Sequence, residues 1–258
     1  MIVSLEAVPR NPEALLASAR AALGFPQIQL INVPDLKRFS LRSWEACGLI
    51  TEAGLKPRVM PHIRAIDFDM NQPFPHREFF RSRGIDRALV IAGDPPDIGP
   101  ENGPEKGDTL GAEIYPTETT AFIRKLKAEM PELKVYAAFD PYRSNIRYEL
   151  DYLTKKEEAG AEAFMSQPFF DLRLLEIYAE YLEGKTVYWG ISPVLSASAR
   201  NYWESRNRAI FPRSFRPDLF WNVDFGRRVL DFCQVRGFNL YLMPIKVDVQ
   251  TYLQGLFS

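Results

Sequence analysis

Short apolar runs alternate with longer amphipathic segments from one end of the chain to the other. The short runs are rich in β-branched residues and have the length of buried strands, whereas the segments between them repeat their apolar positions at helical spacing. Strands are predicted at Ile2–Val8, Gln27–Val33, Arg58–Ile63, Ala88–Ala92, Lys134–Phe139, Ala163–Gln167, Thr186–Ile191 and Phe238–Met243. Helices are predicted at Pro12–Leu23, Leu41–Ala53, Pro75–Arg83, Glu118–Glu129, Ile146–Ala159, Leu172–Leu182, Ala197–Ala209, Asp218–Arg236 and Val249–Leu256.

This alternation is typical of an α/β protein with a parallel sheet. Eight βα units in 258 residues predict one domain, residues 1–258, folded as a single (β/α)8 TIM barrel with its active site at the C-terminal face. The alternative is a doubly wound open sheet, in which we would expect the dinucleotide-binding motif G-x-G-x-x-G after the first strand. The chain continues there with Pro-Arg-Asn-Pro, so the barrel is favoured.

Two local features refine this picture. The connection 94–116 is rich in Gly, Pro, Asp and Glu and far longer than most βα loops, so it predicts either a ligand-binding lid or an insertion without regular structure. Asn11 and Thr117 precede helical segments and are predicted to cap them.

Charge and composition exclude several classes of protein. With 32 Lys and Arg against 33 Asp and Glu, the formal net charge is -1, which argues against a nucleic-acid-binding role. Basic residues gather only in Arg200–Arg216, which is either a partner or anion surface or a plain solvated helix. Two Cys and two His argue against a metal site or a disulfide framework. We find no signal peptide and no apolar run long enough for a membrane span, so we expect a cytoplasmic protein. The sequence is also compatible with a homo-oligomer.

Polar residues at strand ends are the candidates for chemistry, because that rim of a barrel holds the active site. Glu6 lies in an apolar run, where a carboxyl group favours its protonated form and suits a general acid; a salt-bridged core Glu is the alternative. Asp94 follows Gly93 at the end of the fourth strand. It either presents a carboxylate at the rim or is only part of a turn. His62 ends the third strand and is either functional or structural.

The sixth strand ends in Gln167, whose planar amide offers both a donor and an acceptor to a heterocycle. Phe169 and Phe170 follow it. Their rings can stack on a ligand, although spacing alone favours core packing for one of them.

Taken in order, these strand ends resemble the methylenetetrahydrofolate reductase family over essentially the whole chain. The residues that carry the resemblance are Ser4-Leu5-Glu6, Asn32-Val33-Pro34-Asp35, Pro61-His62-Ile63, Ala92-Gly93-Asp94-Pro95-Pro96, Glu158-Ala159-Gly160-Ala161, Ser166-Gln167-Pro168-Phe169-Phe170-Asp171 and Gly190-Ile191-Ser192-Pro193-Val194.

The resemblance implies a TIM barrel that binds FAD and passes a hydride from NADH or NADPH to 5,10-methylenetetrahydrofolate. It implies that Glu6 protonates N10 of the substrate and that Asp94, also catalytic, holds the pterin edge together with Gln167, with Phe169 and Phe170 in the substrate site. The residues it implies for the flavin site are Asn32, His62, Ala92, Gly93, Asp94, Phe139, Glu149 and Lys156.

The chain also departs from the family pattern. Ala92 stands where the family usually has Arg, Phe139 where it has Tyr, and Leu195-Ser196-Ala197 where an aromatic clamp is expected. These departures affect the flavin site more than the folate site, and a redox partner subunit could supply electrons. Two other functions stay open: tetrahydrofolate-dependent methyl transfer or demethylation, and a non-catalytic folate-binding subunit of a redox complex.

Overall fold

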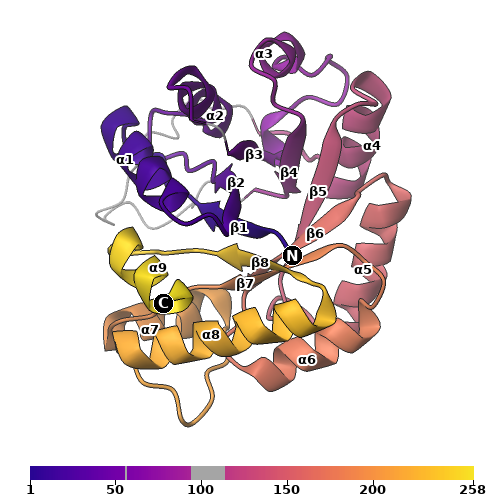
Figure 1. Cartoon of the computed structure of the whole chain (residues 1–258). Helices are drawn as coiled ribbons and strands as arrows, with labels where there is room; N and C mark the ends of the chain where they lie inside the picture. The colour runs from indigo at the N-terminus through magenta and orange to yellow at the C-terminus, as the bar shows by residue number, and fades with distance from the viewer. Residues whose placement is uncertain (56, 94–113) are drawn as a thin grey trace, which may run out of the picture.

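The computed structural model contains a closed barrel of eight parallel strands, and it describes residues 1–55, 57–93 and 114–258. Each strand pairs with the next in the sequence, and β8 closes the barrel on β1 (Figure 1). The strands are β1 Val3–Glu6, β2 Ile28–Val33, β3 Arg58–Arg64, β4 Arg87–Ile91, β5 Lys134–Phe139, β6 Ala163–Pro168, β7 Val187–Ile191 and β8 Asn239–Leu242. The predicted (β/α)8 TIM barrel is thereby confirmed.

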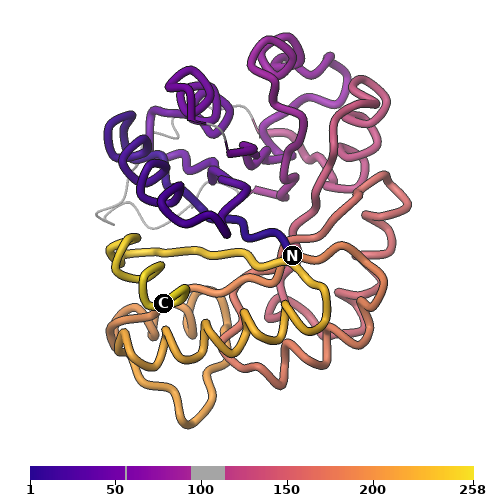
Figure 2. The backbone as a smooth tube through the Cα atoms, viewed as in Figure 1, coloured from indigo at the N-terminus to yellow at the C-terminus, as the bar shows by residue number. Residues whose placement is uncertain are grey.

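Helices surround this barrel, and the backbone trace in Figure 2 follows the alternation from strand to helix around it. They are α1 Pro12–Leu23, α2 Ser43–Glu52, η1 Ala65–Asp67, α3 Arg77–Ser82, α4 Thr119–Glu129, α5 Ile146–Glu158, α6 Leu172–Tyr181, α7 Ala197–Asn207, α8 Leu219–Arg236 and α9 Val249–Phe257. Both α7 and α8 lie between β7 and β8, so α7 is an addition to the simple repeat.

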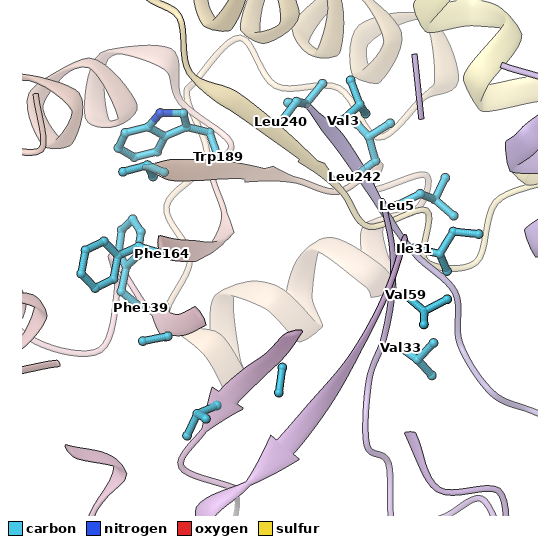
Figure 3. Packing of buried hydrophobic residues seen from close by; sticks show 14 of the residues in the cluster. Val3, Leu5, Ile31, Val33, Val59, Phe139, Phe164, Trp189, Leu240 and Leu242 are labelled. Carbon is cyan, nitrogen blue, oxygen red and sulfur yellow. The ribbon is translucent and has the colours of Figure 1, made fainter. Parts of the chain in front are cut away.

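Strand residues alternate between two apolar layers. The larger layer lies between the strands and the helices and includes outward-facing residues such as Val3, Leu5, Val33 and Trp189 (Figure 3). A smaller cluster fills the barrel interior, with Leu30, Met60, Leu89, Tyr136, Met165, Tyr188 and Tyr241 among its members. Because period-2 alternation places neighbouring residues on opposite faces, the polar residues between outward-facing ones point into the barrel.

Side-chain caps fix where several helices begin. Asn11 accepts a hydrogen bond from the Ala14 amide at 2.8 Å, as predicted, and Asp218 caps α8 through the Trp221 amide at 2.7 Å. The prediction for Thr117 was wrong: Glu118 is the N-cap residue of α4, and the Thr117 hydroxyl instead donates to the Phe68 carbonyl at 3.1 Å. The long connection predicted at 94–116 lies outside the described residues except for its last three positions.

Within the described ranges, none of the helices is both long and apolar enough to cross a membrane.

Candidate functional site

The strand ends meet at one rim, and inward-facing polar side chains from several strands gather there. Ser4 and Glu6 of β1 alternate with Val3 and Leu5, which belong to the outer layer. Hydrogen bonds then join β1 to its two neighbours across the interior, to β8 through Glu6 and to β2 through Ser4. The rim therefore has two polar groups, one on each side of β1.

The first group is a carboxyl–phenol pair. The Tyr241 hydroxyl of β8 donates a hydrogen bond to Glu6 Oε2. Burial raises the pKa of Glu6 from 4.5 to about 7, and the hydrogen bond from Tyr241 offsets only part of that rise. Tyr241 is itself buried, which together with the nearby Glu6 carboxylate raises its pKa well above the usual value. With a pKa of about 7, the Glu6 carboxyl group is partly protonated at neutral pH. Glu6 also keeps some solvent-exposed surface, so a ligand at the rim can reach it.

The sequence did not predict a role for Tyr241. The signal was present in the register, because β8 runs beside β1 with Ser4 opposite Tyr241 and Leu5 opposite Leu242. Predicting that register requires knowing that β8 pairs with β1 to close the barrel, and the pattern of residues along the sequence does not show this.

The second group is a buried chain of three side chains. Asn32 Nδ2 donates to Ser4 Oγ at 2.8 Å, and Asn32 Oδ1 lies 2.9 Å from His62 Nε2. Since the amide oxygen can only accept, His62 Nε2 carries the hydrogen of that bond. Burial lowers the pKa of His62 to about 3, so the imidazole is neutral. Asn32 has no exposed surface and His62 only 6 %, which makes this chain part of the core.

Gln167 is exposed at the end of β6, next to an irregularity in the pairing of β6 with β7. Ser166 Oγ accepts a hydrogen bond from the Gly190 amide at 2.7 Å there. A Cβ at position 190 would lie 2.6 Å from the Ser166 carbonyl oxygen, so the close approach requires glycine. This local packing leaves the Gln167 amide at the surface, where a ligand could use it.

Phe169 and Phe170 do not share that exposure. The Phe169 ring packs edge-on against Trp189 and Tyr178, and the Phe170 ring stacks on Phe211 at a centroid distance of 4.3 Å. Their exposed fractions are 0 % and 1 %. Both rings are therefore packing residues in this structure, although spacing alone had favoured packing for only one of them.

Glu149 and Lys156 lie on the inner face of α5 and bond to the end of β5. Glu149 Oε1 accepts from the Asp140 amide at 3.2 Å, and Lys156 Nζ donates to the Ala138 carbonyl at 2.6 Å. Burial raises the pKa of Glu149 and lowers that of Lys156 to about 8. Both side chains are buried. They fasten the helix to the C-terminal end of the strand.

The remaining residues expected at the flavin site divide into three kinds. Phe139 is buried in the outer layer against Tyr178 and Trp189, because it continues the outward positions of β5. Ala92 and Gly93 are partly exposed, and Gly93 has a φ of +87°, which favours glycine. Asp94 lies outside the described residues.

A flavin needs donors and acceptors that face the ligand, and the described side chains of the expected flavin site have theirs bonded within the protein or have none to offer. The side chains of Asn32, His62, Glu149 and Lys156 are buried and bonded to other protein groups. Phe139 faces the helices. As they lie, these residues do not fit a flavin, and we derive no chemical step through one.

A charged cluster that the sequence did not predict lies after β2 and β3. Arg42 binds Asp35 and also Asp67 Oδ2, the latter at 3.1 Å, while Lys37 Nζ lies 3.0 Å from Asp67. Burial raises the pKa of Asp35, and the positive charge of Arg42 counteracts that rise. The cluster joins the loops that follow two neighbouring strands. Across the described ranges, no three His, Cys, Asp or Glu side chains lie close enough together to hold a metal ion.

Comparison with known proteins supports the fold. No family model matches the chain, and no curated protein matches it. An uncharacterised protein from Clostridium thermocellum that binds two copies of 5-methyl-5,6,7,8-tetrahydrofolic acid superposes with a TM-score of 0.64 at 12% identity, covering 99% of this chain and 92% of that one.

Two other solved structures are similar over most of the chain. A 2,3-dimethylmalate lyase of the PEP mutase/isocitrate lyase superfamily gives a TM-score of 0.60 at 10% identity, covering 95% of this chain and 75% of that one. Dihydropteroate synthase from Thermus thermophilus, in complex with 6HMPPP, gives 0.52 at 13% identity, with 99% and 90% covered. Identities this low show a shared barrel and no more.

Proposed function

We propose that this barrel is a reduced-folate enzyme in which Glu6 is the general acid. The observation that carries the proposal is the Glu6 carboxyl group, which is partly exposed at the rim, accepts a hydrogen bond from Tyr241 and has a pKa of about 7. A general acid works best when its pKa is close to the working pH. The binding of 5-methyl-5,6,7,8-tetrahydrofolic acid by a protein of similar fold supports the substrate class.

The reaction that we assign is reduction of 5,10-methylenetetrahydrofolate. Glu6 donates its proton to N10, the bond between N10 and the methylene carbon breaks, and an iminium forms at N5. A hydride that originates from NADH or NADPH then reaches the methylene carbon and gives 5-methyltetrahydrofolate. Glu6 regains a proton from water, so one proton and one hydride are consumed in each turnover.

Tyr241 and Gln167 have supporting roles in this scheme. The Tyr241 hydroxyl holds Glu6 Oε2, which leaves Glu6 Oε1 to carry the proton toward the substrate. The exposed Gln167 amide can pair with the amide edge of the pterin, since it offers a donor and an acceptor in one plane. Asp94, which is expected beside the same ring, is assigned to the pterin by the resemblance in sequence alone.

A second candidate keeps the folate and changes the reaction. The residues expected to hold FAD are instead bonded within the protein, which favours a folate-dependent methyl-transfer or demethylation enzyme, or a non-catalytic folate-binding subunit of a redox complex. Under this candidate the folate binds with no dependence on nicotinamide.

One experiment separates these candidates. The purified protein is titrated with 5-methyltetrahydrofolate, and binding is followed by calorimetry. It is then supplied with 5,10-methylenetetrahydrofolate and NADH or NADPH, with and without FAD. Binding followed by formation of 5-methyltetrahydrofolate supports the reductase. Binding without reduction supports the second candidate, and no binding of either folate rejects both.

A further inference from the structure

An exposed stripe runs along α8. Phe220 near its start and Val235 near its end are each 85 % exposed, the highest values among the large apolar side chains that the structure describes. At 3.6 residues per turn the two lie within about 60° of each other around the helix axis. Asp224, Arg228 and Asp231 lie between them on the same side and are exposed. The stripe thus has apolar ends and a charged middle of alternating sign.

A basic surface adjoins the start of α8. Arg206, Arg208, Arg213 and Arg216 are exposed, and none of them forms an ion pair with a residue that the structure describes. The same segment exposes Ile210 to 61 %. An apolar side chain among unpaired guanidinium groups is suited to a protein partner with carboxylates around an apolar centre.

An acidic surface of matching character occurs on α6. Glu180 and Glu183 are exposed at its C-terminal end and have no ion pair with any other described residue. Ile177 is 42 % exposed and Tyr181 58 % exposed beside them. The chain therefore carries both members of a complementary pair of surfaces.

The topology sets these two surfaces at opposite ends of the barrel. The basic segment directly precedes Leu219 and so lies at the end of α8 that holds Phe220. Both α6 and α8 lead back from a strand's C-terminal end to the start of the next parallel strand, so their C-terminal ends share the opposite end of the barrel. In Figure 1, α7 lies toward one end of α8 and α6 toward the other.

We propose that α8 forms a two-fold interface with a second copy of this chain. A two-fold axis across the middle of α8 sets the two helices antiparallel, so Phe220 of one copy lies near Val235 of the other. The same operation brings the arginines of each copy toward Glu180 and Glu183 of the other. Every contact occurs twice, as two-fold symmetry requires.

Charge and size both favour a copy of the same chain as the occupant. A net charge of -1 leaves almost no general repulsion between copies, while the segregated surfaces attract. The 18 residues of α8 extend about 27 Å, long enough to cross a patch of roughly 800 Å² per partner, the size of an ordinary stable interface. A polyanion such as RNA would satisfy the arginines but leave Ile177, Tyr181 and Val235 exposed.

Sedimentation velocity on the full chain tests the interface at low and high protein concentration. The expected result is a dimer whose dissociation constant rises at least about tenfold with Phe220→Asp, because each copy then loses a large ring from its contact with Val235 of the other copy. The matched control is Tyr148→Asp, which changes a 60 % exposed ring on α5, away from this face, and should leave the dimer unchanged. Circular dichroism confirms that each variant is folded.

Charge reversal supplies a second arm. Arg213→Glu with Arg216→Glu should weaken the dimer, as should Glu180→Arg with Glu183→Arg, and the chain with all four changes should dimerise again. A monomer at every concentration overturns the proposal, whether or not it binds RNA or a foreign acidic protein. A dimer insensitive to Phe220→Asp overturns it too.

Discussion

The two polar groups at the rim, one on each side of β1, differ in exposure and in hydrogen bonding. Toward β8, Glu6 keeps exposed surface and one hydrogen-bonded phenol, and burial raises its pKa to about 7. Toward β2 and β3, Asn32 and His62 are buried with their amide and ring groups bonded, and burial lowers the pKa of His62 to about 3. Position at a strand end therefore does not decide function by itself. A strand-end side chain can act on a ligand only where it is exposed and keeps a polar atom free to bond.

Replacing the acid should give the largest effect. Glu6→Gln keeps the size and the acceptor for Tyr241 but removes the proton, so folate reduction should fall about 10²- to 10⁴-fold. In the wild type, kcat should decrease as pH rises above about 7, because Glu6 then loses its proton. Steady-state rates across pH measure both effects. Full activity in Glu6→Gln would remove Glu6 from the mechanism.

Breaking the buried chain should mainly affect stability. Asn32→Leu leaves the His62 N–H and the Ser4 hydroxyl without their partner, which should cost about 2–4 kcal/mol of unfolding free energy. Ser4→Ala is the matched control, since it removes a single bond and should cost about 1 kcal/mol. Urea denaturation measures both. If Asn32→Leu is as stable as the wild type, the hydrogen bonds that Asn32 makes to Ser4 and His62 do not stabilise the fold.

The raised pKa of Glu6 also has a consequence for stability. A carboxyl group whose pKa rises from 4.5 to about 7 on folding stabilises the fold below pH 4.5 and loses that contribution as pH increases through 7. Glu6→Gln should therefore be more stable than the wild type at about pH 8, by up to about 3 kcal/mol, and equal to it at about pH 4. Denaturation at both pH values checks the sign, and equal stability at both contradicts the shift.

The smallest effect is expected at Gln167. Gln167→Ala removes an exposed amide, so KM for the folate should rise about tenfold, equivalent to about 1.4 kcal/mol, with little change in unfolding free energy. Lys155→Ala, on an exposed position of α5, is the control and should change neither quantity. An unchanged KM in Gln167→Ala would place the pterin elsewhere.

The sequence predicts the barrel well because its period-2 and period-3.6 patterns are local. Each described strand and α-helix lies within a residue or two of its predicted bounds, and Glu6 and Gln167 follow from being strand ends. Tyr241 could not be found this way, because its partner Glu6 lies at the other end of the chain and meets it only when the barrel closes.

Some packing roles are indicated by the sequence pattern itself. Phe139 follows Val135 and Ala137 at alternate positions, which already indicates the outward face of β5. Glu149 and Lys156 share the inner face of α5 with Leu153. Nothing local, however, indicates that Glu149 and Lys156 would bond to the backbone of β5 instead of to a ligand, since that depends on how α5 packs on the strand.

The proposed function depends on Glu6 being a protonated acid at a folate-binding rim of the barrel. Carbon-13 NMR of protein labelled at the glutamate carboxyl carbon measures it directly, with Glu6→Gln identifying the signal. We expect a Glu6 pKa of about 7 in the free protein and a change in that signal when 5-methyltetrahydrofolate is added. A Glu6 pKa near 4.5 that does not respond to the folate would contradict it.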